Sequence, residues 1–211
     1  MRSDERPFPS AVVVAAACLL AAGCATRPAE PVATPAAAVA PAPVDPAAQA
    51  AFDAALRSLA AGKVDQAEQG FKNLTRTHPD LGGPHADLGL IYRQNGKLPE
   101  AVAALEQAVR ASPQQAVYWN QLGVAYRQQG RFTQAREAYE QALQIDPDYA
   151  AATLNLGILN DLYLGDSRRA LELYERYLAL SPGGDPTVGK WIVDLNNRKP
   201  QRLASGQKDK P

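Results

Sequence analysis

The chain has 211 residues, of which 46% are hydrophobic, 21% charged and 7% aromatic, a composition typical of globular proteins. Its 22 Lys and Arg residues balance 22 Asp and Glu residues, so it lacks the surplus of positive charge that nucleic-acid binding requires. The two cysteines (Cys18 and Cys24) lie near the N-terminus, and the two histidines (His78 and His85) are separated by Pro79 and a Gly pair. Composition therefore argues against a disulfide framework, a metal site and an enzyme.

Residues 1–23 have the pattern of a secretory signal peptide, with a polar head and an uncharged apolar run from Ala11 to Ala22. This run is shorter than the ~20 residues that a helix needs to cross a bilayer. The small residues that precede Cys24 resemble a bacterial lipoprotein signal, which implies cleavage before Cys24 and acylation of that cysteine. By the same resemblance, Ala25 implies the outer membrane of a Gram-negative host. The alternative is an ordinary secretory signal, in which case Cys24 has no role.

Residues 24–47 consist of the expected lipidated cysteine followed by a segment that is mostly Ala and Pro. Proline denies a helix its hydrogen bonds and pushes the preceding residue into an extended conformation. The segment is therefore predicted to be a disordered, semi-rigid tether.

Behind the tether the sequence repeats itself with a period of about 34 residues. Pro79, Pro113 and Pro147 are 34 residues apart, and Pro182 follows after 35. Alanine recurs 12 residues before each proline, a large apolar residue recurs eight before it, and a Leu-Gly pair recurs at the start of three units. These positions are Ala67, Ala101, Ala135 and Ala170; Phe71, Leu105, Tyr139 and Tyr174; and Leu88-Gly89, Leu122-Gly123 and Leu156-Gly157.

This pattern resembles the tetratricopeptide repeat. Residues 116–149 carry it most completely, with Trp119, Leu122, Gly123 and Tyr126 on one helical face. The resemblance implies an all-α, right-handed superhelical solenoid of about four helix-turn-helix units closed by a capping helix. The expected units are 48–81, 82–115, 116–149 and 150–184, the cap is 185–197, and a disordered basic tail covers 198–211.

Local details of the repeats give further expectations. Gly62, Gly96 and Gly130 are predicted to lie in the turns between paired helices, where a positive φ is tolerated. His85 takes the tryptophan position of the second unit and is predicted to be packed rather than to bind a metal. The first unit keeps only the second half of the pattern, and the fourth carries one extra residue near Leu164.

The family resemblance also implies a binding surface, because the first helices of successive units line a concave groove. The expected groove residues are Phe52, Leu56, Leu90, Arg93, Gln94, Asn120, Val124, Arg127, Gln128, Ile158 and Asp161. Arg93 and Arg127 are expected to be neighbours that favour carboxylates or extended backbone carbonyls. The alternative is that both are solvated surface residues. The Lys and Asn clamp of chaperone-binding relatives is missing, since Phe52 and Leu56 occupy its positions.

The predicted protein is a membrane-anchored periplasmic scaffold that binds partner proteins through this groove. It is not expected to be an enzyme or to need a cofactor, a metal, a nucleic acid or a small-molecule substrate. By architecture it resembles pilotin-like factors that assist envelope complexes. Two alternatives are an adaptor for peptidoglycan hydrolases and a structural subunit of an energy-transducing envelope complex.

Overall fold

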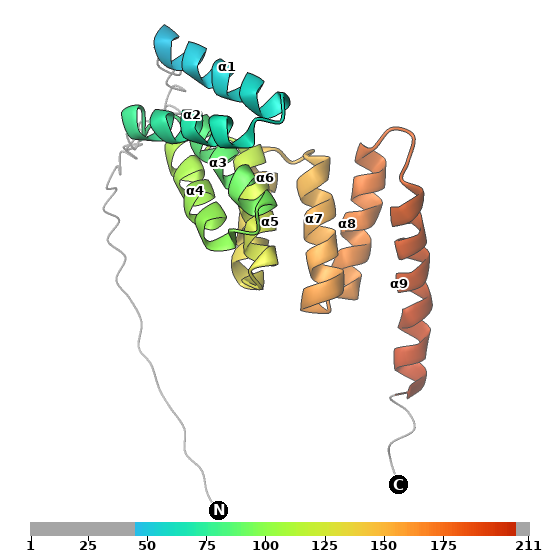
Figure 1. The fold of residues 1–211 in the computed structure, drawn as a ribbon. Coiled ribbons are helices and arrows are strands. Elements are labelled where there is room, and N and C mark those ends of the chain that lie inside the picture. Colours follow the sequence, from blue (N-terminus) through green and yellow to red (C-terminus); the bar gives the residue numbers. More distant parts are fainter. Residues whose placement is uncertain (1–44, 206–211) are drawn as a thin grey trace, which may run out of the picture. The chain divides into compact units, whose positions relative to one another are not determined.

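The computed structural model describes residues 45–205, with side chains as far as Arg198. The predicted signal peptide, Cys24 and residues 206–211 lie outside the described residues. All regular structure in the described part is helical, which confirms the all-α prediction (Figure 1). The helices are α1 (Pro46–Ala60), α2 (Val64–Thr77), α3 (Gly82–Gln94), α4 (Leu98–Ala111), α5 (Ala116–Gln128), α6 (Phe132–Ile145), α7 (Ala150–Leu159), the π-helical η1 (Asn160–Leu164), α8 (Ser167–Leu180) and α9 (Pro186–Ser205).

Each predicted unit is a pair of packed helices, and each pair also packs against the next. The pairs are α1 with α2, α3 with α4, α5 with α6, and α7 (Ala150–Leu159) with α8, and α9 packs on α8. The first helices also contact one another, α3 with α5 and α5 with α7. The first helices therefore form one layer of the solenoid and the second helices form the other.

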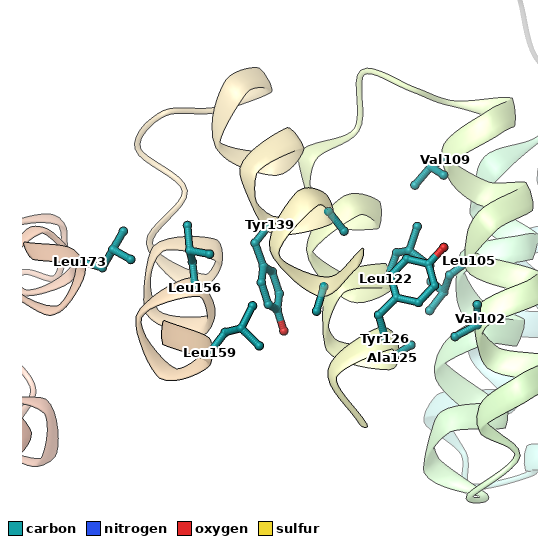
Figure 2. Packing of buried hydrophobic residues seen from close by; sticks show 12 residues of the cluster. Val102, Leu105, Val109, Leu122, Ala125, Tyr126, Tyr139, Leu156, Leu159 and Leu173 are labelled. Atoms are coloured by element: carbon teal, nitrogen blue, oxygen red, sulfur yellow. The ribbon is translucent and has the colours of Figure 1, made fainter. Parts of the chain in front are cut away.

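The core is continuous from one unit to the next rather than divided between them. One buried cluster joins Val102 and Leu105 of α4 to residues of α5, α6, α7 and α8. Figure 2 shows Tyr139 of α6 at the centre of this cluster, between Leu122 on one side and Leu156 on the other. Because a unit buries its apolar face only by stacking on a neighbour, stability is shared along the array.

The glycine of the Leu-Gly pair allows the two helices of a unit to approach closely. A Cβ atom built on Gly123 would lie 2.6 Å from Cδ1 of Tyr139, and one built on Gly89 would lie 2.5 Å from Cγ of Leu105. Any larger residue would have to displace a fully buried side chain.

The repeat also specifies where its helices end. Gly62, Gly96 and Gly130 have φ values of 73°, 72° and 76°, which confirms their predicted place in the turns between paired helices. At the other end of the second helices, residues before a proline are extended, as with Ser112 at φ −138° and ψ 72°. Each second helix therefore ends two residues before its proline.

His85 performs the structural task of the tryptophan that it replaces. Nε1 of Trp119 donates a hydrogen bond to the carbonyl oxygen of Pro113 at 2.8 Å. Nε2 of His85 lies 3.2 Å from the equivalent carbonyl oxygen of Pro79. Burial also lowers the pKa of His85, which favours the neutral imidazole. The predicted packed role of His85 is confirmed.

Both ends of the solenoid differ from the sequence-based boundaries. The helix α1 begins at Pro46, inside the predicted tether, because the Asp45 carboxylate accepts a hydrogen bond from the backbone of Ala47. At the other end Asp185 caps α9 as predicted, accepting hydrogen bonds from the backbone N–H groups of Thr187 and Val188. The cap was expected to end at 197, but α9 continues to Ser205. Among the described residues, no helix combines the length and apolarity needed to cross a membrane.

Candidate partner-binding surface

The first helices of units two to four leave three rows of half-buried side chains between core and solvent. Within each row the residues are 34 positions apart, and within each helix the rows are three positions apart. We call these nine residues the inner face. They are the acid–amide row (Asp87, Gln121 and Asn155), the aliphatic row (Leu90, Val124 and Ile158) and the arginine row (Arg93, Arg127 and Asp161).

Arg127 contacts the buried Tyr139, and the charge of Arg93 is close enough to affect the same hydroxyl group. Nε of Arg127 donates a hydrogen bond to the hydroxyl oxygen of Tyr139 at 3.4 Å. Burial raises the pKa of Tyr139, and the positive charges of Arg127 and Arg93 partly oppose that rise. Arg93 and Arg127 therefore lie near each other, as the sequence predicts.

Arg93 differs from Arg127 in having no acceptor for one of its donors. The second unit has Leu105 at the position of Tyr139 in the third unit. It therefore offers no hydroxyl group at that position. Nε of Arg93 is buried and has no hydrogen-bond partner among the described residues. A buried unsatisfied donor destabilises the protein. Because this atom has less than 1 Å² of accessible surface, a group from another molecule reaches it only if the side chain moves.

The acid–amide row carries its charge at Asp87 of α3. Burial raises the pKa of this carboxyl group to about 6. No basic side chain of the described part forms a salt bridge with Asp87. A cationic group from outside the chain would stabilise the ionised form.

Two predicted groove residues hold the units together instead of facing outward. Asn120 is 4% exposed, and its side-chain oxygen accepts a hydrogen bond from Nδ2 of Asn155 at 3.0 Å. The side chain of Asp161 is 5% exposed, and it accepts hydrogen bonds from the hydroxyl of Tyr174 and from Arg198, each at 3.4 Å. The polar atoms of these two side chains are therefore already engaged within the solenoid.

The other predicted residues fall into two groups. Gln94 and Gln128 are exposed at the ends of α3 and α5. In unit one, Leu56 is 37% exposed, whereas Phe52 packs on Phe71 with ring centroids 5.7 Å apart. Phe52 is therefore part of the packing between α1 and α2 within unit one.

The π-helical turn η1 exposes apolar side chains that the sequence analysis did not single out. Leu162 is 64% exposed, Tyr163 44% and Leu164 37%. The extra residue of unit four is absorbed here as a wider turn, and Nδ2 of Asn160 donates to the carbonyl oxygen of Leu156 at 2.8 Å. Tyr163 reaches back to unit three, where its ring lies 4.7 Å from that of Phe132. The extra residue was the only sequence signal for this feature.

Two shallow hollows of about 310 and 400 Å³ lie beside turns, and no residue of the three rows lines either of them. Among the described residues, no group of three His, Cys, Asp or Glu side chains is placed to hold a metal ion.

Comparison with known proteins agrees with this architecture. Residues 52–116 and 86–150 match the family described as the tetratricopeptide repeat. No curated protein sequence matches the chain.

Several solved structures share the fold. One, from a functional characterization of Pseudomonas aeruginosa PilF, is 22% identical, with a TM-score of 0.65 over 76% of this chain and 72% of that one. MamA (41–end) from Desulfovibrio magneticus RS-1 is 17% identical, with a TM-score of 0.66 over 78% of this chain and 92% of that one. An O-GlcNAc transferase of Thermobaculum terrenum is 24% identical, with a TM-score of 0.57 over 63% of this chain but 26% of that one. At these identities the likeness shows the fold alone.

Proposed function

We propose that this tetratricopeptide-repeat protein is a lipid-anchored scaffold of the bacterial cell envelope. Its fold is typical of non-enzymatic protein-binding scaffolds. The partner protein binds on the inner face. The observation that carries the binding role is the pair formed by Arg93 and Arg127. Both guanidinium groups are half-buried, and neither forms a salt bridge among the described residues. Carboxylates of another protein would therefore find two neighbouring cations that the solenoid itself leaves unpaired.

The anchoring role is supported by the sequence at the N-terminus. An apolar run of 12 residues is followed by small residues and then Cys24, the arrangement of a lipoprotein signal. Attached acyl chains contribute about 0.8 kcal/mol per buried methylene, so two or three chains give a stable anchor. The Ala and Pro residues of 25–44 would then space the solenoid from the outer membrane, on the periplasmic side.

Within the envelope, we propose a pilotin-like or assembly role, in which the scaffold holds a component of a larger complex near the membrane. An adaptor for peptidoglycan hydrolases and a structural subunit of an energy-transducing complex use the same surface and anchor. The identity of the captured partner distinguishes these three roles.

The test is cross-linked capture of the full-length protein from bacterial membranes, followed by mass spectrometry. Arg93→Glu with Arg127→Glu reverses the two inner-face charges. Arg110→Glu with Arg136→Glu makes the same charge change on exposed positions of the second helices and serves as the control. We expect one dominant partner that the control double variant keeps and the inner-face double variant loses, with both variants folded by circular dichroism. A partner that both variants keep would overturn the proposed binding site.

A second arm tests the anchor. Mass spectrometry of the mature N-terminal peptide should show an acylated Cys24, and Cys24→Ala should move the protein from the membrane fraction to the soluble fraction. An unmodified Cys24 at an internal position of the mature chain would overturn the anchor while leaving the binding role intact.

A further inference from the structure

The charges of the inner face are separated into two rows with an aliphatic row between them. Asp87 stands on one side of Leu90 and Arg93 on the other, and α5 repeats the aliphatic and arginine positions with Val124 and Arg127. In α1, Asp53 and Leu56 occupy the corresponding positions for the acid–amide and aliphatic rows. A partner that fits this surface has an apolar centre, one acidic edge and one basic edge.

The spacing of the rows matches the width of a helix. Arg93 lies six positions after Asp87, which corresponds to about 9 Å along the axis of α3. An α-helix with its side chains is about 10–12 Å wide. A partner helix that lies across α3, α5 and α7 therefore places its centre on the aliphatic row and its two edges on the charged rows.

The repeat distance between units favours a helix over an extended strand. Adjacent packed helices lie roughly 8–10 Å apart. Seven residues of a partner helix advance about 10.5 Å and return to nearly the same face, so one heptad meets each unit. Three residues of an extended strand advance about 10 Å, but an odd number of residues reverses the side-chain direction. A strand would therefore present opposite faces to successive units.

Two inner-face groups lack an oppositely charged neighbour that such a helix would supply. Arg93 is half-buried and forms no salt bridge within the described residues. Asp87 is partly buried and has no salt-bridge partner there. An acidic side chain on one edge and a basic side chain on the other satisfy both groups in one binding event.

We propose that the inner face binds an amphipathic helix of the partner protein, with apolar residues on Leu90, Val124 and Ile158, an acidic edge on Arg93 and Arg127, and a basic edge on Asp87. The inference deepens the proposed function, on which it rests. Turning a helix end for end exchanges its two edges. The surface therefore selects helices with segregated charges, and the arrangement of those charges sets the direction in which the helix lies.

The probe is a synthetic, fluorescently labelled peptide of three heptads with Leu at positions a and d, Glu at every g and Lys at every e. A control peptide of identical composition distributes Glu and Lys evenly between both edges. A second control carries a central proline at position f, which breaks the helix. Binding is measured by fluorescence anisotropy with the full-length protein in detergent, at peptide concentrations where the peptide alone is monomeric. The variant pair Arg93→Glu with Arg127→Glu, in the same detergent, corrects for binding to micelles.

We expect the segregated peptide to bind about tenfold more tightly than the mixed one. The segregated peptide places an opposite charge at each partly desolvated inner-face charge, whereas the mixed peptide places like charges at some of them. The inner-face double variant should lose this preference and instead prefer a peptide with Lys on both edges, which a merely destabilised protein would not do. Equal binding of segregated and mixed peptides would overturn the charge pattern, and full binding of the proline peptide would overturn the helical occupant. If the peptides fail while membrane capture still depends on Arg93 and Arg127, the inference fails and the proposed function stands. If capture is also insensitive to those arginines, both fail.

Discussion

Units two and three are near copies of each other, whereas unit four follows the repeat on its core side and departs from it elsewhere. All three pack a glycine of the first helix against a large side chain of the second, and Gly157 meets Tyr174 as Gly123 meets Tyr139. On the inner face, however, unit four has Asp161 where units two and three have arginine. The first helix of unit four also ends in a π-helical turn. The contrast indicates that the core requirement is common to every unit and that surface positions are free to specialise.

The largest expected effect comes from breaking the shared core contact. Gly123→Val places new atoms against the buried ring of Tyr139, so it should destabilise the protein by about 3 kcal/mol. Gly189→Ala is the matched control, since a Cβ atom there meets nothing within 4 Å. It should leave stability unchanged or raise it by up to about 1 kcal/mol. Urea unfolding followed by circular dichroism measures both, and equal losses in the two variants would contradict the close-packing argument.

A smaller effect distinguishes unit two from unit three at the acid–amide row, where Asp87 corresponds to the neutral Gln121. Burial raises the pKa of Asp87 from its ordinary value of 3.8 to about 6. The folded state therefore holds this proton more tightly than the unfolded state, and the contribution of Asp87 to stability falls as the pH rises from 3.8 through about 6. Asp87→Asn should consequently stabilise the protein by about 1 kcal/mol at neutral pH, a figure reduced for the partial exposure of the carboxylate.

The sign of this effect can be checked by repeating the thermal unfolding at two pH values. The gain from Asp87→Asn should be present above about pH 6 and disappear near pH 4. The matched variant Gln121→Asn shortens a neutral side chain in unit three and should show no pH-dependent gain. A gain from Asp87→Asn that is the same at both pH values would show that the ionised carboxylate is not its cause.

The smallest effect concerns the π-helical turn of unit four. Tyr163→Ala removes a ring that contacts Phe132 but is 44% exposed. The substitution should therefore lower the free energy of unfolding by about 0.5 kcal/mol or less. Phe132→Ala removes a half-buried ring that packs on the core cluster and should cost more. Chemical denaturation measures both. Equal costs would mean that Tyr163 contributes to the core of unit three.

The sequence predicts the features that recur and misses those that occur once. The 34-residue period predicts the helix pairs, the turn glycines and the packed His85 because each follows from a contact that every unit must make. It also predicts that Arg93 and Arg127 are neighbours. It does not predict that Asp161 is held by Tyr174 and Arg198, because Arg198 comes from a helix outside the repeat pattern. Nor does it predict the exposure at η1, since one extra residue can be absorbed in the loop or in the helix.

The shallow attachment of α1 has a mechanical consequence. A pull transmitted through the N-terminal segment enters the described part of the chain at Asp45 and loads α1 before any other helix. The helix α1 fully buries the small residues Ala48 and Ala55 and packs Phe52 and Leu59 in part, whereas α4 buries Val102, Leu105 and Val109 among others. Under tension α1 should therefore separate first, while the three units that carry the inner face keep their shape. With the chain anchored at Cys24 as we propose, this separation would lengthen the connection between the membrane and the inner face.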